Sequence, residues 1–403
     1  MPSIPSSDPA APPRRPAWLA ALGWVAALAL LVAAPFVLTA DSHKFYIELL
    51  SKVMIMAIFA LSLQLLIGYT GLVSLGHAAY FAIAAYATAM LAPQGEAGNG
   101  WLLLLGALGA SALLALAVGA LVLRTRGVYF IMVTLAFAQM VYFVFHDTGI
   151  AGGSDGTYIY FRPEFGLLSE RPVSIAEPVA FYWFVLGALV VSLAGLAMLL
   201  RSRFGHALVG IRHNEQRMRA AGYGTYRYQL GAFVAGGMLA GLAGYLYAIQ
   251  FGFVNPEIAS WHQSGNAMLM VILGGVGSLA GAVLGAFSFV LLAEWFSTLT
   301  KHWQLLMGTF IIVAVALLPR GLVSLPSVLR SGMRGRRRVR ERQQAVPPAE
   351  GGESGTVGHA GPHVHPQAGS HDGANTGANT GANTGVHAVP HAGSHEARGR
   401  EAI

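Results

Sequence analysis

The sequence predicts an all-α, polytopic membrane protein with about ten transmembrane or half-membrane helices and a disordered C-terminal tail. The first observation is the composition. Of 403 residues, 55% are hydrophobic and 11% are charged, whereas soluble globular proteins carry about 25% charged residues. The second is a series of long runs without a charged residue. The third is that glycine clusters divide the two longest of these runs.

Eight apolar runs contain no Asp, Glu, Lys or Arg, and a membrane-spanning helix needs about 20 residues. Most of the runs fit one crossing. The two longest, 53–92 and 258–293, each carry a central glycine cluster and are predicted to form two shorter helices or a broken helix. Continuous apolarity favours helices, since barrel strands alternate polar and apolar residues. The eight runs are residues 17–40, 53–92, 97–123, 127–146, 178–200, 228–256, 258–293 and 302–319.

The first run follows Arg14 and Arg15, as the apolar part of a signal peptide would. Its length exceeds the usual 7 to about 15 residues of such a segment, so we interpret it as a retained first helix. The chain contains no cysteine, which excludes disulfides and thiolate metal sites.

Arginine placement orients the predicted helices, because cytoplasmic loops carry an excess of positive charge. Segment 201–228 holds six arginines against one glutamate and is predicted to be cytoplasmic, whereas the acidic segment 146–180 is predicted to be periplasmic. Ten crossings put every arginine-rich segment on one side. The predicted layout is an N-terminal cytoplasmic segment (1–16), a transmembrane domain (17–320) and a cytoplasmic tail of low complexity (321–403).

The tail contains the repeat GANTGANTGANTG and seven of the 14 histidines. Its composition predicts disorder. The irregular spacing of the histidines and the lack of clustered acidic partners favour a solvated extension over a metal site. We interpret its arginine run as a topology signal and a contact for anionic lipids, rather than as a nucleic-acid site.

A phosphate-binding loop is absent from the sequence. Such a loop needs glycine directly before its lysine, and the three lysines of this chain follow His43, Ser51 and Thr300. If the protein moves a solute with ATP, a separate subunit must hydrolyse the ATP, and this chain needs no cofactor of its own.

Residues 201–230 form the longest polar stretch between two apolar runs. Their pattern predicts a short amphipathic helix around residues 212–221, with Glu215 and Arg219 at i,i+4 spacing and with Gly222 and Gly224 at its end. An ordinary basic loop is the alternative. The order of helix, glycine and membrane helix favours a docking element.

Four motifs resemble the permease subunits of branched-chain amino acid ABC importers, specifically the M-type half of the Liv system. The resemblance extends from about residue 53 to residue 322, with the motifs in the family's order. It does not cover the tail from about residue 331. The motifs are GYTGLVSLGHAAYFAIAAY, RGVYFIMVTLAFAQM followed by TGIAGGSDG, RHNEQRMRAAGYGTYRYQLGAFVAGGMLAGLAG, and LGGVGSLAGAVLGA.

The resemblance implies a pore-forming subunit in a bacterial inner membrane. Its partners would be an H-type permease, two cytoplasmic ATP-binding subunits and a periplasmic solute-binding protein. Segment 214–222 matches the family's coupling loop, which inserts into a groove on the ATPase. The residues assigned to ATPase coupling are Arg212, Asn214, Glu215, Arg219, Ala220 and Gly222.

The glycine clusters suggest where a solute would pass. Two interrupted apolar segments, one in each half of the chain, are typical of a transporter core, and unwound backbone is tolerated in a membrane where it lines a cavity. Tight helix packing without solute contact is the alternative. The residues predicted to line or flank the path are Gly68, Gly71, Ser74, Gly76, His77, Gly274, Gly275, Gly277 and Ser278.

The motif HDTGIAGGSDG, residues 146–156, raises the alternative of acid-base catalysis. Adjacent residues on a helix are not expected to face each other, and neither a nucleophile nor metal-ligand spacing accompanies them. We therefore predict a periplasmic loop that contacts the binding protein or shapes the outer gate. Its residues are Gly152, Gly153, Ser154, Asp155 and Gly156.

Two other transport functions stay open. Urea and short-amide ABC permeases are closely similar to the family named above. An ion-coupled secondary transporter would need an ionisable residue within its core helices, and the sequence offers only His77, His262 and groups near a helix end such as Glu294. That scarcity argues against ion coupling.

Overall fold

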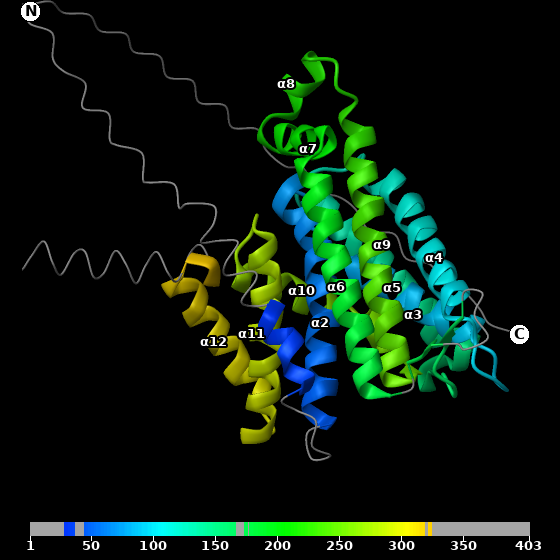
Figure 1. Ribbon diagram of the computed structural model, residues 1–403. Coiled ribbons are helices and arrows are strands. Elements are labelled where there is room, and N and C mark those ends of the chain that lie inside the picture. Colours follow the sequence, from blue (N-terminus) through cyan, green and yellow to red (C-terminus); the bar gives the residue numbers. More distant parts are fainter. Residues whose placement is uncertain (1–27, 37–43, 167–172, 176, 319–320, 325–403) are drawn as a thin grey trace, which may run out of the picture. The chain divides into compact units, whose positions relative to one another are not determined.

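The structure is a computed structural model. It describes residues 28–36, 44–166, 173–175, 177–318 and 321–324, and these residues are predominantly helical (Figure 1). The predicted cytoplasmic segment 1–16 and nearly all of the predicted tail lie outside the described residues. Residues 28–36 form a short helix within the first predicted apolar run.

The elements follow one another in a simple order, with long helices joined by short links and a few two-residue strands. They are α2 (Lys44–Gln64), the π-helical turn η2 (Leu65–Thr70), α3 (His77–Leu91), α4 (Gly100–Val122), α5 (Val128–Asp147), η3 (Ile150–Asp155), β1 (Thr157–Tyr158), β2 (Glu164–Phe165), β3 (Val173–Ser174), α6 (Pro178–Arg201), α7 (Arg203–His213), α8 (Glu215–Ala220), α9 (Thr225–Phe251), β4 (Phe253–Val254), η4 (Pro256–Ala259), α10 (Trp261–Gly274), α11 (Leu279–Leu299), α12 (Trp303–Leu317) and η5 (Leu322–Ser324).

The prediction of an all-α membrane fold is confirmed. Six helices of the described residues are long and apolar enough to cross a membrane: 44–70, α4, α5, α6, α9 and α11. The apolar helices α3, α10 and α12 are shorter, with 15, 14 and 15 residues. Both long runs are broken at their glycine clusters, the first between η2 and α3 and the second between α10 and α11.

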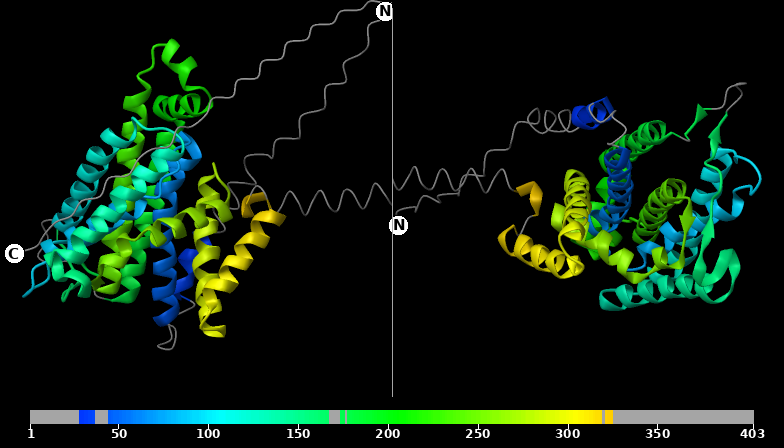
Figure 2. Two further views of the ribbon diagram at one scale, coloured as in Figure 1. Left: turned by 180° about the vertical axis from the view of Figure 1, so that it is seen from behind. Right: turned by 90° about the horizontal axis from the view of Figure 1, so that it is seen from below.

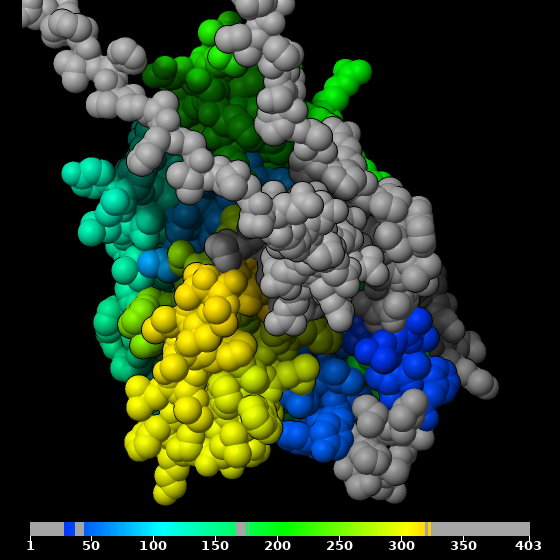
Figure 3. Space-filling view, turned by 90° about the vertical axis from the view of Figure 1, so that its left-hand side faces the viewer, coloured from blue at the N-terminus to red at the C-terminus, as the bar shows by residue number. Residues whose placement is uncertain are grey.

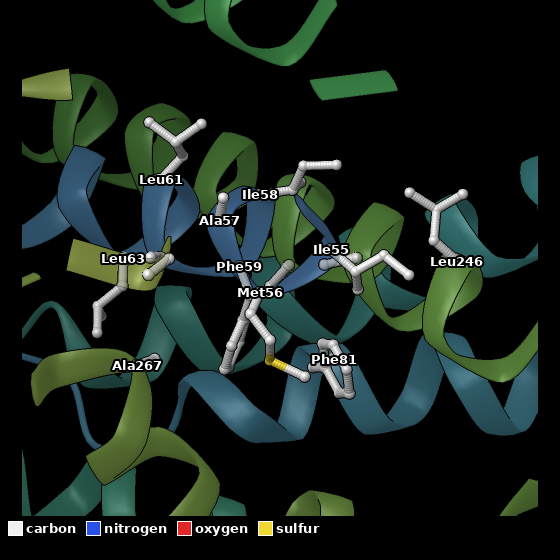
Figure 4. Close-up of a cluster of buried hydrophobic side chains, with 14 of the residues drawn as sticks. Ile55, Met56, Ala57, Ile58, Phe59, Leu61, Leu63, Phe81, Leu246 and Ala267 are labelled. Atoms are coloured by element: carbon white, nitrogen blue, oxygen red, sulfur yellow. The ribbon is translucent and has the colours of Figure 1, made fainter. Parts of the chain in front are cut away.

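Helix α2 lies at the centre of the packing. It contacts α6, α9, α10 and α11, and from below it is seen among them (Figure 2). Its residues from Val53 onward are almost all buried, and they form a cluster with Phe81 of α3 and Leu246 of α9 (Figure 4). A helix that is apolar on all sides is expected in such an enclosed position.

Helix α9 packs closely on α3 and α4 through small residues. A Cβ atom built on Gly244 would lie 2.0 Å from the carbonyl oxygen of Phe81, so only glycine allows this approach. One and two turns earlier, Gly241 and Gly237 face Ser111 and Ala115 of α4. Small residues spaced four apart are a common means of helix association in membranes.

The two ends of the helix bundle are defined by contacts between distant segments. At one end, Tyr226 donates to the Ala120 carbonyl (3.0 Å), and α7 and α8 lie beside the start of α9 (Figure 1). At the other end, β1 pairs with β4, and Gln250 donates to the Glu48 carbonyl (2.7 Å). The basic segment 201–228 and the residues of the acidic segment around β1 therefore lie at opposite ends, and their assignment to the cytoplasmic and periplasmic sides stays a prediction.

Helix α12 lies at the edge of the described fold, beside α11 (Figure 1), and it is on the face turned toward the viewer in Figure 3. Its outer side chains Leu305, Ile312 and Leu317 are about 70% exposed. So large an apolar surface is expected to face lipid or another protein.

Candidate functional site

The basic loop forms two helices, α7 and α8. The prediction of one helix around residues 212–221 is wrong in this respect, because Arg212 lies in the last turn of α7, which ends at His213, while α8 begins at Glu215. Between them Asn214 has extended backbone, and its side chain accepts a hydrogen bond from the Arg217 backbone N–H (2.9 Å). Asparagine is a preferred N-cap because it satisfies such a donor, so this residue starts a new helix instead of continuing the old one.

Glu215 connects α8 to two other segments, the α4–α5 link and the start of α9. Its carboxylate lies 2.5 Å from the Arg219 guanidinium, at the predicted i,i+4 spacing, and 3.3 Å from the Arg126 guanidinium. It also accepts a hydrogen bond from the Thr225 hydroxyl at the start of α9 (3.2 Å). The carboxylate thus fixes α8 between the α4–α5 link and α9.

The surface of α8 is open. None of its residues is buried, and Ala220, its last residue, is exposed. Gly222 follows with φ +84° and has no atom near the position of a Cβ. The left-handed backbone favours glycine there. The geometry suits a docking surface, and contact with an ATPase stays a prediction.

Arg212 points toward the helix bundle rather than along α8. Its guanidinium donates a hydrogen bond to the carbonyl oxygen of Gly68, in η2. Its aliphatic stem passes Gly71, where a Cβ would lie 3.3 Å from Cγ of Arg212. One residue of the predicted coupling group therefore contacts two residues of the first glycine cluster.

The two glycine clusters, some 200 residues apart in sequence, meet in the structure. Gln64 donates to the Ser278 carbonyl and the Tyr69 hydroxyl donates to the Gly277 carbonyl, each over 3.2 Å. In the second cluster, Gly274 and Gly275 are buried. A Cβ on Gly274 would lie 1.8 Å from the Gly281 carbonyl oxygen, so this glycine permits the close packing of α10 on α11.

Three further residues of the predicted path, Ser74, Gly76 and His77, are buried. A Cβ on Gly76 would lie 2.4 Å from the Thr134 carbonyl oxygen. The His77 ring nitrogen Nε2 lies 2.9 Å from the Ser62 hydroxyl, and that hydroxyl donates to the Phe59 carbonyl. In this arrangement these residues serve helix packing, and their contact with a solute stays a prediction.

The conformation and attachment of the glycine-rich loop after α5 depend mainly on its backbone, through positive φ angles and the pairing of β1 with β4. Gly152 and Gly153 lie in η3 with positive φ, as does Ala151, and the exposed Ser154 donates to Asp155 (3.3 Å). Gly156 then adopts φ +75°, where a Cβ would lie 2.3 Å from the Val254 carbonyl oxygen. This approach lets β1 pair with β4. The loop is thereby attached to the end of α9, and its role as a gate or binding-protein contact stays a prediction.

The expectation that His146 and Asp147 point apart is wrong. Nδ1 of His146 lies 2.6 Å from a carboxylate oxygen of Asp147. The pair lies at the C-terminal end of α5, and both side chains are exposed. The described residues contain no group of three or more His, Cys, Asp or Glu that could hold a metal ion.

A polar cavity of about 690 Å³ is the feature that sequence reasoning missed. It carries charges of both signs, from Lys52 of α2 and Glu257 of η4, and apolar groups such as Met56. None of the nine residues predicted to form the path lines it. The lining residues are Lys52, Met56, Gln139, Tyr142, Tyr247, Asn255, Glu257, Ile258, Ser260, Trp261, His262, Gln263 and Asn266.

Two smaller hollows adjoin this cavity along α10. They measure about 260 and 290 Å³, and both include Asn266. Lys52, which borders the first of them, lies 3.7 Å from the Glu294 carboxylate of α11, with both side chains about one-third exposed. The polar surface therefore extends from η4 along α10 to α11.

Comparison with known proteins identifies the family. The model of the branched-chain amino acid transport system permease component matches residues 45–316. The chain belongs to this family. It is 31% identical over 318 residues to the high-affinity branched-chain amino acid transport system permease protein LivM of Salmonella typhimurium, and equally to that of Escherichia coli K12, covering 74% of each chain.

A more distant relative of this permease is the xylose transport system permease protein XylH of Escherichia coli K12. It is 30% identical over 131 residues, which cover 30% of this chain and 33% of the relative. No solved structure matches the chain. Family membership and the apolar helices make the protein a multi-pass membrane permease subunit of an ABC transport system.

The polar face of α10 is the sequence signal that could have indicated the permease's cavity. His262 and Asn266 are spaced four apart and therefore share one side of the helix. Lys52 and Glu257 fall immediately outside the uncharged runs. They look like helix-end residues in the sequence, and only the fold brings them to one cavity.

Proposed function

We propose that this chain is the M-type permease subunit of an ABC importer for branched-chain or similar amino acids in a bacterial inner membrane. The LivM relatives support the substrate class. The observation that carries the proposal is the polar cavity, with one ammonium and one carboxylate in its lining. The cavity forms part of the solute path.

The lining chemistry matches an aliphatic amino acid. The Lys52 ammonium is suited to the solute's carboxylate, and the Glu257 carboxylate to its ammonium group. Met56, Ile258 and Trp261 supply apolar surface for its side chain. Pockets for small molecules measure about 300 to 1,000 Å³, so an amino acid fits with water beside it. Urea and short amides carry no charged groups and gain less from this pair of charges.

ATP binding and hydrolysis belong to separate subunits in this proposal. Each of the three lysines lacks a preceding glycine, so the chain has no phosphate-binding loop. The exposed helix α8 docks on one of two ATP-binding subunits. A second, H-type permease completes the pore, a periplasmic solute-binding protein delivers the solute at the opposite end, and lipid contacts the outer helices. The permease needs neither a cofactor nor a nucleic acid.

The proposal is tested by uptake into proteoliposomes. The chain is co-expressed with the H-type permease and the ATP-binding subunits encoded by neighbouring genes. Uptake of labelled leucine is then measured with the solute-binding protein outside the proteoliposomes and ATP inside them. We expect ATP-dependent uptake that unlabelled isoleucine and valine suppress and urea does not. Uptake by this chain alone, driven by an ion gradient, would contradict the proposal.

Charge variants of the cavity test the substrate contact. Lys52→Gln and Glu257→Gln should each lower uptake about tenfold at low solute, which corresponds to about 1.4 kcal/mol. The control is Lys301→Gln, an exposed lysine between α11 and α12 outside the cavity lining. Unchanged uptake in both cavity variants would contradict the assigned contact.

A further inference from the structure

The long helix of residues 44–70 ends in η2, and its last carbonyl groups need partners outside the helix. A helix leaves about four carbonyl groups unpaired at its C-terminus. Here the Leu66 carbonyl receives the N–H groups of Gly71 and Leu72 and the hydroxyl of Thr70. The Gly68 carbonyl instead receives the guanidinium of Arg212, from the basic loop.

Arginine is well suited to this position. Its planar group donates several hydrogen bonds in a fixed geometry, and its positive charge is favourable at a helix C-terminus. Gly71 has φ +76° and no side chain, which leaves room for the stem of Arg212. The contact therefore depends on a glycine as well as on the arginine.

The same turn also contacts the second helix break. Tyr69, next to Gly68, donates to the Gly277 carbonyl, and Gln64 donates to the Ser278 carbonyl. The Gln64 side-chain oxygen is buried and has no hydrogen-bond partner among the described residues. A buried acceptor without a partner is unfavourable. A rearrangement of the junction that gives this oxygen a donor would therefore be favoured.

The basic loop can transmit a displacement to this turn. Helix α8 contacts α7 and α9, and α7 contacts η2 directly. The buried residues Leu208 and Ile211 anchor α7, and Arg212 follows them at its end. A push on the exposed α8 thus reaches η2 through α7.

We propose that Arg212 is a positioning residue that ties the basic loop to both helix breaks, so that movement of α7 shifts η2 and residues 275–278 together. The inference rests on the proposed function, because the ATP-binding subunits supply the movement. Arg212 then acts inside the permease and does not hold the ATPase. Its loss separates ATP hydrolysis from transport.

The test uses the complete reconstituted complex, and the quantities are the amount of ATPase subunit retained, the ATPase rate, and the solute taken up per ATP hydrolysed. We expect Arg212→Gln to keep the ATPase subunits and an ATPase rate within twofold, while uptake per ATP falls at least fivefold. Arg212→Lys should restore part of the uptake, because an ammonium group can still donate to the Gly68 carbonyl.

Two further variants keep the inference falsifiable. Tyr69→Phe removes only the hydroxyl that contacts Gly277. If Arg212→Gln prevents the permease from folding, the uptake per ATP of Tyr69→Phe tests the inference instead. The double variant Arg212→Gln/Tyr69→Phe should lose no more uptake per ATP than the more impaired of the two single variants. Arg203→Gln, at the exposed start of the same helix α7, is the control for loss of charge.

Normal uptake per ATP in Arg212→Gln and Tyr69→Phe would overturn the inference. Loss of the ATPase subunits from an Arg212→Gln permease that is itself folded, or an equal fall in Arg203→Gln, would also overturn it. Absence of ATP-dependent uptake in the unmodified complex would instead contradict the proposed function itself.

Discussion

The first helix break, residues 71–76 between η2 and α3, and the second, residues 275–278 between α10 and α11, are held by different kinds of contact. Side-chain hydrogen bonds predominate at the first, beside the close approach of Gly76 to the Thr134 carbonyl. The Thr134 hydroxyl accepts from the Leu75 N–H (3.3 Å), and the Ser264 hydroxyl accepts from the Ala78 N–H (2.9 Å).

Backbone packing predominates at the second break, beside the hydrogen bonds that Gln64 and Tyr69 donate to the Ser278 and Gly277 carbonyls. Cβ atoms on Gly274 and Gly285 would lie within 2 Å of carbonyl oxygens on the facing helix. Ser278 caps α11 by accepting from the Gly281 N–H (3.2 Å).

The difference indicates how each break can respond to movement. Closely packed backbones have little freedom to rearrange, because such an interior has so little free volume that even one added methylene group changes its stability. Side-chain hydrogen bonds can exchange partners over small displacements. We infer that α10 and α11 move as one hairpin, with η2 and residues 275–278 shifting together, while the start of α3 adjusts around them.

The largest expected effect comes from filling the second break. Gly285→Ala puts a Cβ about 1.9 Å from the Met270 carbonyl oxygen, so the backbones must separate, at a cost of more than about 3 kcal/mol. We expect little folded protein by size-exclusion chromatography and a strongly lowered midpoint of thermal unfolding. Gly187→Ala, at an exposed α6 position with open space, is the matched control and should be neutral or slightly stabilising. Normal folding of Gly285→Ala would show that the hairpin is looser than we infer.

A smaller effect is expected from Ser264→Ala, which leaves the buried N–H of Ala78 without its partner. An unsatisfied buried donor costs about 1–3 kcal/mol. The free energy of unfolding in detergent should fall by that amount, compared with about 0.5 kcal/mol or less for the exposed control Ser297→Ala. Equal effects of the two variants would show that the hydrogen bond between the Ala78 N–H and the Ser264 hydroxyl of α10 does not stabilise the first break.

The smallest effect on stability is expected from Gly71→Ala. An alanine at φ +76° costs about 1–2 kcal/mol, and its methyl group also displaces the Arg212 stem. Gly149→Ala, at φ +63° with open space, should cost a similar amount without touching Arg212. Uptake by the assembled transporter should therefore fall only in Gly71→Ala. A similar fall in both variants would assign the loss to backbone strain.

Much of the fold could be predicted because lipid imposes strong demands on a sequence. Charge-free runs gave the helices, and the clusters around Gly68 and Gly274 gave the two breaks. The split of the basic loop was not foreseen, because the capping preference of Asn214 competes with the helical pattern around it. The proximity of His146 and Asp147 also escaped prediction, since the helix ends there and the spacing rule of helix interiors no longer applies.

The candidate site was predicted less well, because its parts come from distant segments. The nine residues chosen from the glycine motifs were recognisable by their unusual presence in apolar runs, but most of them are packed between helices. The cavity draws residues from α2, α5, α9, η4 and α10. Each is unremarkable in its own stretch of sequence. The inward contact of Arg212 likewise needs the fold, because a basic loop alone does not indicate which arginine turns toward the bundle.

Site-specific photo-crosslinking tests the central claim, that α8 faces the ATP-driven part of the transporter while the loop after α5 faces the solute supply. A photoreactive amino acid replaces Gln216, exposed on α8, or Tyr160, which is 69% exposed at the opposite end. Membranes holding the full complex and the solute-binding protein are then irradiated. We predict an adduct between position 216 and an ATP-binding subunit, and one between position 160 and the solute-binding protein. An ATP-binding subunit captured at position 160, or none captured at position 216, would contradict the account.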